Sequence, residues 1–246
     1  MGSSQESYSS KKDPRIIQAN DELACSARWG EEEEIKHALG QGANPNHVGR
    51  FGHPPLWLCA ERGHAHCLET LVNAGAKLNF SASNNLTALA AAATRGHIAA
   101  MEELLRLGAS VHGNAKGEMS PLLWVAEMSP QNLAAAQLLI AHGADPLARD
   151  LQGRGVLDIL TREMRGERLA SLIMAMGADP RQASAQGRSP LEESARRSQD
   201  RMGQDNPLLL AFQAVARSLT EKEALEALPV TENAGHSQVK KTAPRI

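Results

Sequence analysis

Aromatic residues and cysteines are scarce in this chain. Its 246 residues include only three Phe, three Trp, one Tyr and three Cys. Large β-sandwiches and barrels build their cores mainly from aromatic and β-branched residues, so this composition argues against them. Because the cysteines are odd in number, they indicate reduced thiols inside helices rather than a disulfide framework.

A strong charge of one sign and long apolar runs are also missing. The 26 Lys and Arg residues are matched by 28 Asp and Glu, which leaves a net charge of -2. Without a basic excess we expect no nucleic-acid partner, and without a run of about eighteen apolar residues we expect no membrane span. Residues 1–15 contain no apolar segment typical of a secretory signal. The sequence therefore predicts a cytoplasmic protein.

What the chain does have is a fixed internal period. A Gly-Ala pair recurs at steps of 33 to 35 residues, at Gly42-Ala43, Gly75-Ala76, Gly108-Ala109, Gly143-Ala144 and Gly177-Ala178. A leucine recurs with the same period about twenty residues before each pair, at Leu23, Leu56, Leu89, Leu122 and Leu157, and Leu191 opens a further unit. Self-similarity at this period is typical of repeat architectures.

Each unit predicts two short helices. A turn containing Gly or Asn leads into a helix start such as Pro54-Pro55 or Ser120-Pro121, where Pro loses no hydrogen bond and Ser can cap exposed N–H groups. Small residues such as Ala92-Ala93 follow, which favours close helix packing. A Gly-His break, as in Gly63-His64, then separates this helix from a second one.

These marks resemble the ankyrin repeat, whose unit is a β-turn followed by two helices. The clearest copies run from Gly52 to Asn79 and from Asn84 to His112. The resemblance implies an all-α fold, a solenoid of stacked helix-turn-helix units with β-turn tips. It also implies a concave groove that binds another protein.

On this basis the chain divides into a repeat domain and two tails. The repeat domain covers residues 15–219, with units starting near residues 18, 51, 84, 117, 152 and 186 and a C-terminal cap at 207–219. Residues 1–14 and 220–246 are polar and lack an apolar period, so we expect disordered tails. The fourth unit departs from the pattern, because Glu127-Met128-Ser129-Pro130-Gln131-Asn132 stands in place of the Gly-His break and adds two residues.

The resemblance implies which residues face a partner, namely the two residues after the small pair of each first helix and the turn tips. The positions after the small pairs are Arg28, Trp29, Glu61, Arg62, Thr94, Arg95, Glu127, Met128, Arg162, Glu163, Arg196 and Arg197. The tips add Arg50, Phe51, His53, Met119 and Arg154.

Five of the six pairs contain an arginine, which predicts a basic concave stripe on a nearly neutral chain. Such a stripe favours a partner with an acidic docking surface, since arginine and tryptophan often anchor interfaces. The alternative is that these arginines only keep the groove soluble. We expect Trp29 and Phe51 to be exposed, with folding back against the neighbouring tip as the alternative for Phe51. Trp57 and Trp124 are interpreted as packing residues.

Catalytic and metal-binding patterns are weak. His64, His66 and Cys67 lie near Cys59 and could ligate zinc, but His64 belongs to the Gly-His break, and no second ligand pair follows at zinc-finger spacing. Neither a Gly-x-Ser-x-Gly elbow nor a phosphate-binding Gly-rich loop occurs. We expect no enzymatic activity, no cofactor and no metal. An active site in the Ser198–Pro207 segment or on the turn tips is the alternative.

These observations predict a protein–protein interaction module that is a monomer when unbound. Arginine outnumbers lysine and alanine is abundant, which is typical of GC-rich bacterial genomes. We therefore interpret the chain as an immunity protein that inhibits a cognate bacterial toxin. The alternatives are a secreted effector that engages host proteins, a regulatory adaptor of an enzyme, and an oligomer built by end-to-end stacking.

Overall fold

The computed structural model describes residues 13–81, 85–113, 119–183, 187–200 and 206–226. These ranges contain twelve α-helices and no strand, which confirms the predicted all-α class. The helices are α2 (Pro14–Trp29), α3 (Glu32–Gly40), α4 (Pro55–Arg62), α5 (Ala65–Asn73), α6 (Ala88–Arg95), α7 (Ile98–Arg106), α8 (Pro121–Met128), α9 (Leu133–Ala141), α10 (Val156–Glu163), α11 (Glu167–Ala175), α12 (Pro190–Asp200) and α13 (Pro207–Glu226).

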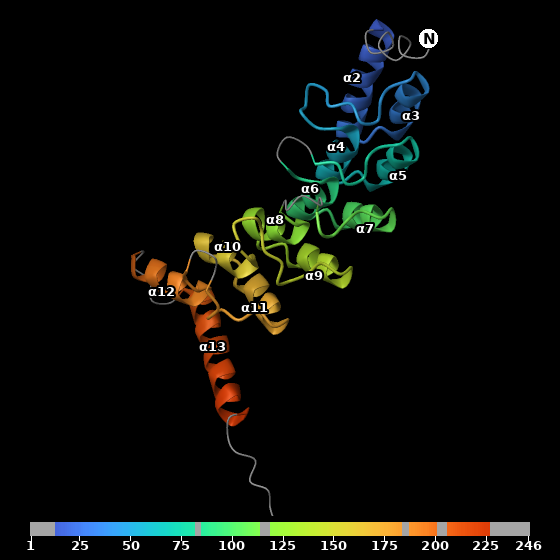
Figure 1. The fold of residues 1–246 in the computed structure, drawn as a ribbon. Coiled ribbons are helices and arrows are strands. Elements are labelled where there is room, and N and C mark those ends of the chain that lie inside the picture. The colour runs from blue at the N-terminus through green and yellow to red at the C-terminus, as the bar shows by residue number, and fades with distance from the viewer. Residues whose placement is uncertain (1–12, 82–84, 114–118, 184–186, 201–205, 227–246) are drawn as a thin grey trace, which may run out of the picture.

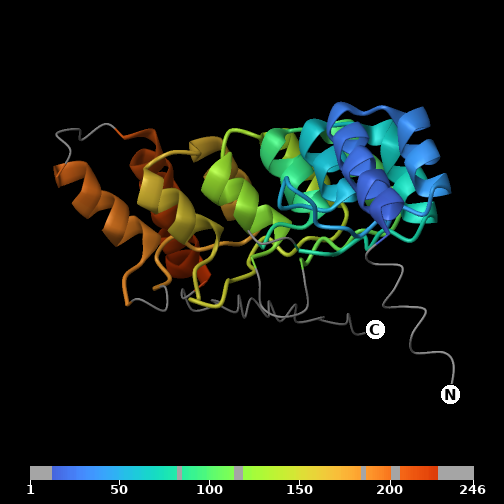
Figure 2. The same ribbon diagram turned by 90° about the horizontal axis from the view of Figure 1, so that it is seen from above.

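The helices form two parallel rows in a curved stack (Figure 1). Helices α2, α4, α6, α8, α10 and α12 pack in sequence along the first row, and α3, α5, α7, α9, α11 and α13 pack along the second. Turned by 90°, the same stack shows the long connecting loops gathered along one side of the helices (Figure 2). Helices α2 and α13 lie at opposite ends of the stack.

Local signals in the sequence explain where the first-row helices begin and end. Helices α4 and α8 begin at Pro55 and Pro121, and the Oγ atom of Ser120 accepts a hydrogen bond from the Leu123 N–H at 3.4 Å. Helix α4 ends at Arg62, and Gly63 directly after it has a left-handed φ of 80°. Proline at the start and glycine just past the end is the expected asymmetry of a short helix.

The periodic leucines lie in the core, as their spacing suggests. Leu23, Leu56, Leu89, Leu122 and Leu157 are all buried, and so are the small residues Ala27, Ala60 and Ala93 beside them. Burying one leucine contributes about 1.5–3 kcal/mol, and the small residues let adjacent helices approach closely. Since each helix pair covers the apolar face of the next, the stack is stabilised through nearest-neighbour contacts.

Both ends of the stack extend beyond the predicted repeat domain. Helix α2 begins at Pro14, and the Asp13 carboxylate caps it by accepting a hydrogen bond from the Arg15 N–H at 2.9 Å. Helix α13 continues to Glu226, so a disordered tail from residue 220 is wrong for residues 220–226. The remaining parts of the two predicted tails, 1–12 and 227–246, lie outside the described residues.

A contact across the stack involves the last turns of α13. The Arg181 guanidinium, which precedes α12, donates to both carboxylate oxygens of Glu223 at 2.7 and 3.1 Å. Nη2 of the same guanidinium lies 2.8 Å from Oδ2 of Asp179. Hydrogen bonding to Arg181 lowers the pKa of Glu223 and of Asp179. This cluster fixes the last turns of α13 although their sequence has no apolar period.

Candidate functional site

Each first-row helix is tied to the next unit through a carbonyl group in its last turn. His64 Nε2 lies 3.1 Å from the carbonyl oxygen of Arg28, and His97 Nε2 lies 3.1 Å from the carbonyl oxygen of Glu61. These carbonyls have no partner within their own helix ends, so the imidazoles satisfy them. The bonds fix the position of the residues that were predicted to face a partner.

Glycine is needed opposite each of these histidines. Gly63 has a φ of 80°, and a Cβ atom added there would lie 2.8 Å from Nδ1 of His97. The glycine thus provides the left-handed turn and also the space for the imidazole of the next unit. The Gly-His break found in the sequence is therefore an inter-unit contact as well as a helix end.

Further along the stack, the same carbonyl position is bonded by other side chains. Asn132 Nδ2 donates to the Thr94 carbonyl at 3.2 Å, and Ser129 Oγ donates to the same oxygen at 2.6 Å. Arg165 Nη2 donates to the Glu127 carbonyl at 3.4 Å, and Arg197 Nη1 donates to the Arg162 carbonyl at 2.7 Å. Sequence reasoning missed these contacts because only their place in the period is constant, and the residue type changes.

Carboxylate groups pair with most of the arginines in the predicted row. Glu61 Oε2 lies 3.1 Å from Arg62 Nε, and Glu61 Oε1 lies 2.6 Å from Arg95 Nη2. Glu127 Oε1 lies 3.4 Å from Arg162 Nη1. The stripe is therefore a row of ion pairs over these units rather than a run of unpaired positive charges.

A carboxylate also organises the last unit. Glu193 lies 2.7 Å from both Arg196 Nη2 and Arg197 Nε, and 3.3 Å from Arg188 Nη1. Hydrogen bonds from Arg196, and then from Arg197, lower the pKa of Glu193 to about 2. Glu193 stays ionised at neutral pH and gathers three guanidinium groups around one carboxylate.

The first unit is different, because an aromatic ring takes the place of the carboxylate. The guanidinium carbon of Arg28 lies 4.8 Å from the ring centroid of Phe51, and that of Arg50 lies 5.1 Å from it. Within the described residues neither Arg28 nor Arg50 forms an ion pair. Trp29, next to Arg28, is 68% exposed, as expected from the sequence.

Several predicted contact residues face the protein instead of solvent. Thr94 is only 7% exposed and donates from Oγ1 to the Ala91 carbonyl at 3.0 Å, so its prediction as a solvent-facing residue is wrong. Phe51 and Met119 are half-buried against the core. For Phe51 this corresponds to the alternative of folding back. Met128 remains exposed.

The remaining predicted tips, His53 and Arg154, are held by their own surroundings. The His53 ring stacks on Trp57 with a centroid distance of 3.6 Å, and burial lowers the pKa of this imidazole. Arg154 Nη2 lies 2.7 Å from Oδ2 of the buried Asp150 side chain within the same turn. Both residues therefore stabilise turns, which leaves little of either side chain to contact a partner.

The histidines and cysteines that could have ligated a metal are used for hydrogen bonds. His66 Nε2 lies 3.0 Å from the Gly30 carbonyl, and Cys59 Sγ lies 3.2 Å from the Ala27 carbonyl. A hydrogen bond with Cys67, together with burial, raises the pKa of the Cys59 thiol. In the described ranges, no group of three or more His, Cys, Asp and Glu residues is placed to hold a metal ion.

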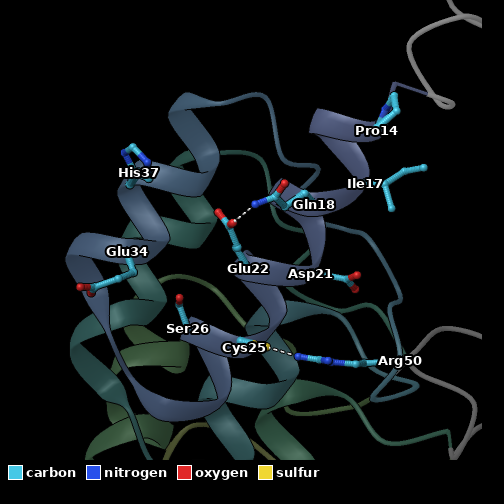
Figure 3. A pocket seen from close by; sticks show the side chains of 10 residues that line it. All are labelled: Pro14, Ile17, Gln18, Asp21, Glu22, Cys25, Ser26, Glu34, His37 and Arg50. Carbon is cyan, nitrogen blue, oxygen red and sulfur yellow. Dashed lines mark hydrogen bonds between the residues drawn. The ribbon is translucent and has the colours of Figure 1, made fainter.

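An open cavity of about 580 Å³ lies at the N-terminal end of the stack, between α2, α3 and Arg50. Figure 3 shows Arg50 reaching the sulfur of Cys25 from one side and Gln18 bonded to Glu22 on another. Ile17, which lines the cavity, is 51% exposed. No local pattern in the sequence indicated this cavity, which lies at the end of the stack, where no further unit among the described residues packs on α2.

A second hollow of about 390 Å³ lies between α10 and α12 near the other end. Its lining includes Arg162, Arg188 and Arg197, and Glu193 pairs with Arg188 and Arg197. No helix in the described part of the chain is long and apolar enough to cross a membrane.

Comparison with known proteins places this architecture in a family. The family model described as Ankyrin repeats (3 copies) matches residues 23–115. A search of curated proteins finds no match to the chain. Ankyrin repeats generally act as protein–protein interaction modules, and the arrangement of the two helix rows agrees with this family. Residues 23–115 are thus ankyrin repeats.

Proposed function

We propose that the chain binds one partner protein through the surface formed by the first-row helix ends and the turns beside them. We also propose that the helix pairs after residue 115 continue the same repeat, which gives six units and one continuous groove. The observation that carries the proposal is the arginine row with the exposed Trp29 at its N-terminal end. Arginine and tryptophan are the side chains most enriched at interface hot spots.

The greater exposure of the arginine side chains, compared with the glutamates that pair with them, supports a partner with an acidic docking surface. The Arg95 side chain is 59% exposed, whereas its partner Glu61 is 14% exposed. The Arg162 side chain is 56% exposed, whereas Glu127 is 26% exposed. An approaching protein meets guanidinium groups first, because the carboxylates lie beneath them. Such complementarity speeds association and disfavours basic partners.

We propose that the partner is a bacterial toxin and that the chain acts in the cytoplasm as its immunity protein, a monomer until it binds. The side-chain bonds to the helix-end carbonyls favour tight binding by this surface, because a surface fixed before binding loses little conformational entropy on contact. A secreted effector that engages host proteins, or a regulatory adaptor of an enzyme, would use the same surface with a different partner.

Co-expression with the protein encoded beside this chain would test the proposal. We expect the two to elute together and growth arrest by that protein to be relieved. The double charge reversal Arg62→Glu with Arg95→Glu should weaken both effects. Arg168→Glu with Arg217→Glu is the matched control, because both residues lie in the second row and form no ion pair within the described residues.

Two outcomes would contradict the proposal at different levels. A complex that forms without relieving growth arrest would contradict the immunity role and retain the binding surface. Relief of growth arrest that is unchanged by the Arg62 and Arg95 reversals would contradict binding through this row.

A further inference from the structure

We propose that the main anchor point of the groove is the cluster Arg28, Phe51 and Arg50, with Trp29 beside it, and that it binds a single carboxylate side chain from an otherwise uncharged, partly apolar segment of the partner. This inference rests on the proposed protein-binding function and names the chemistry that the partner brings. We call these four residues the anchor cluster.

The first argument is that the anchor cluster has two positive charges and no negative one. The guanidinium carbons of Arg28 and Arg50 lie 4.8 and 5.1 Å from the same Phe51 ring centroid, so two positive charges flank one aromatic ring. The aromatic ring offsets only part of their repulsion, since a cation–π contact at an exposed site is weak. Within the described residues, the Arg28 guanidinium donates no hydrogen bond, and Arg50 donates only to Cys25 Sγ.

The second argument is that the same molecule already shows what completes such a pair. Glu61 bridges Arg62 and Arg95 at 3.1 and 2.6 Å. Glu193 bridges Arg196 and Arg197, both at 2.7 Å. Two guanidinium groups on one carboxylate is therefore a recurring arrangement of this surface. The anchor cluster has the guanidinium groups and lacks the carboxylate, which a partner can supply.

The third argument is that Phe51 holds the arginines in place before binding. The ring packs partly against the hydrophobic core, so it is fixed by the fold. The planar guanidinium group keeps its N–H donors at its edge when its face lies on an aromatic ring. The donors of Arg28 therefore remain available for a carboxylate, and less side-chain entropy is lost when one binds.

The surroundings of the anchor cluster indicate which residues can lie next to the partner's carboxylate. Arg50 also lines the N-terminal cavity, whose other walls include the exposed Ile17 and the carboxylates Asp21 and Glu34 (Figure 3). A run of acidic residues would be repelled by Asp21 and Glu34. An apolar residue beside the carboxylate would instead contact Ile17 or Trp29. The cluster therefore fits one carboxylate with apolar neighbours better than a polyacidic segment.

Selection from a random peptide library displayed on phage, using the full-length chain as bait, would test this. We expect the enriched peptides to share one Asp or Glu next to apolar residues. The best peptide is then synthesised in three forms, with the carboxylate, with the matching amide, and with phosphoserine at that position. Affinities are measured by calorimetry for the wild type and for three double variants.

The variants are Arg28→Gln with Arg50→Gln at the anchor cluster, Arg62→Gln with Arg95→Gln further along the groove, and Arg168→Gln with Arg217→Gln in the second row. All three remove two positive charges. We expect the anchor variant to weaken the carboxylate peptide by on the order of tenfold or more, as does the amide form of the peptide. The second-row control should stay within about twofold, because long-range attraction falls off over about 10 Å at moderate salt.

A coupling measurement identifies the contact itself. Arg28→Gln should lower the affinity for the carboxylate peptide. It should leave the weaker affinity for the amide peptide nearly unchanged, because the amide peptide has already lost the carboxylate that Arg28 contacts. Equal losses for both peptides would overturn the proposal.

The other outcomes separate this inference from the proposed function. Enriched peptides without an acidic residue, or tighter binding of the phosphoserine form, would overturn the carboxylate assignment. Binding that depends on Arg62 and Arg95 but not on Arg28 and Arg50 would overturn the anchor cluster and leave the groove as the binding surface. If no enriched peptide depends on any groove arginine, both proposals fail.

Discussion

The two halves of the helical stack join their units with different side chains, and this difference decides where arginine is available. In the N-terminal half, His64, His97 and Asn132 bond the helix-end carbonyls. In the C-terminal half, Arg165 and Arg197 occupy the same place in the period. Arginines there connect neighbouring units, whereas Arg28 and Arg50 at the other end make no such bond.

The comparison shows that a residue type along a groove does not by itself identify a contact surface. Arg197 and Arg28 both lie within two residues after the small pair of their helices. Arg197 is bonded to Glu193 and to the Arg162 carbonyl, whereas Arg28 contacts the Phe51 ring. Only the neighbours in space separate a structural arginine from one that can bind a partner.

The largest expected effect tests the imidazole contacts of the N-terminal half. Gly63→Ala should lower the free energy of unfolding by about 2–4 kcal/mol, because the left-handed backbone is strained and the new Cβ displaces His97. Gly75→Ala is the matched control, since Gly75 has a φ of 92° and no atom within 4 Å of a built Cβ. It should cost about 1 kcal/mol. Urea unfolding measures both, and equal losses would contradict the packing argument.

A smaller effect compares the two kinds of donor directly. His97→Ala leaves the Glu61 carbonyl without its partner and should cost about 1–3 kcal/mol. Arg197→Ala should cost less than about 1 kcal/mol, because solvent reaches that site more easily and exposed charge pairs contribute little. Added salt should reduce only the second loss. Urea unfolding at low and high salt gives the comparison, and a larger loss for Arg197→Ala would reverse our view of the two halves.

Removing one carboxylate would convert a pair of neutralised arginines into an unpaired one. Glu61→Gln removes the carboxylate between Arg62 and Arg95, so their guanidinium groups should resemble those of the anchor cluster. We expect a few-fold tighter binding of an acidic peptide at low salt, with the gain disappearing at high salt. Glu69→Gln is the matched control, because Glu69 pairs with Arg106 in the second row at 2.9 Å. Weaker binding by Glu61→Gln would show that the carboxylate assists recognition.

The smallest expected effect is a pH dependence of stability that arises from Glu193 in the C-terminal half. The pKa of Glu193 is lowered from 4.5 to about 2 in the folded protein. Its stabilising contribution is therefore complete above about pH 4.5 and is lost as the pH falls toward 2. Glu193→Gln should flatten the loss of stability in this range, whereas Glu221→Gln should not. Urea midpoints measured at several pH values would show it, and parallel curves for wild type and Glu193→Gln would contradict the assignment.

In the N-terminal half, His53 is expected to make stability depend on pH in a higher range than Glu193 does. Burial lowers the pKa of His53 below 6.5, so the unfolded chain takes up the proton first as the pH falls. Stability from the neutral ring is present above pH 6.5 and declines below it. His53→Gln should remove this decline in urea midpoints, and an unchanged decline would assign it to another group.

Much of the fold was predictable because its signals are local and repeated. The period of Leu and Gly-Ala, the prolines at helix starts and the Gly-His breaks each act within one unit or between adjacent units. The exposed Trp29 followed from its place after the small residues of α2. The buried side chain of Thr94 did not follow, because the hydroxyl bonds its own helix at Ala91.

The candidate site was predictable only as a row of positions. The sequence indicated that an arginine follows the small residues in most first-row helices. It did not indicate that Arg95 and Arg162 pair with carboxylates of the preceding units, or that Arg28 contacts the ring of a separate turn. The length of α13 was missed for the same reason, since Glu223 depends on Arg181 across the stack. Patterns within one unit cannot reveal a pair formed between distant ones.

The sequence alone determined the repeat, the all-α class and the buried leucines, because hydrophobic period and helix capping act over a few residues. Tertiary structure decided which arginines are neutralised and which are not, because an ion pair depends on distances of a few ångströms between side chains from different units. That spatial detail separates Arg28 and Arg50 from the rest of the row.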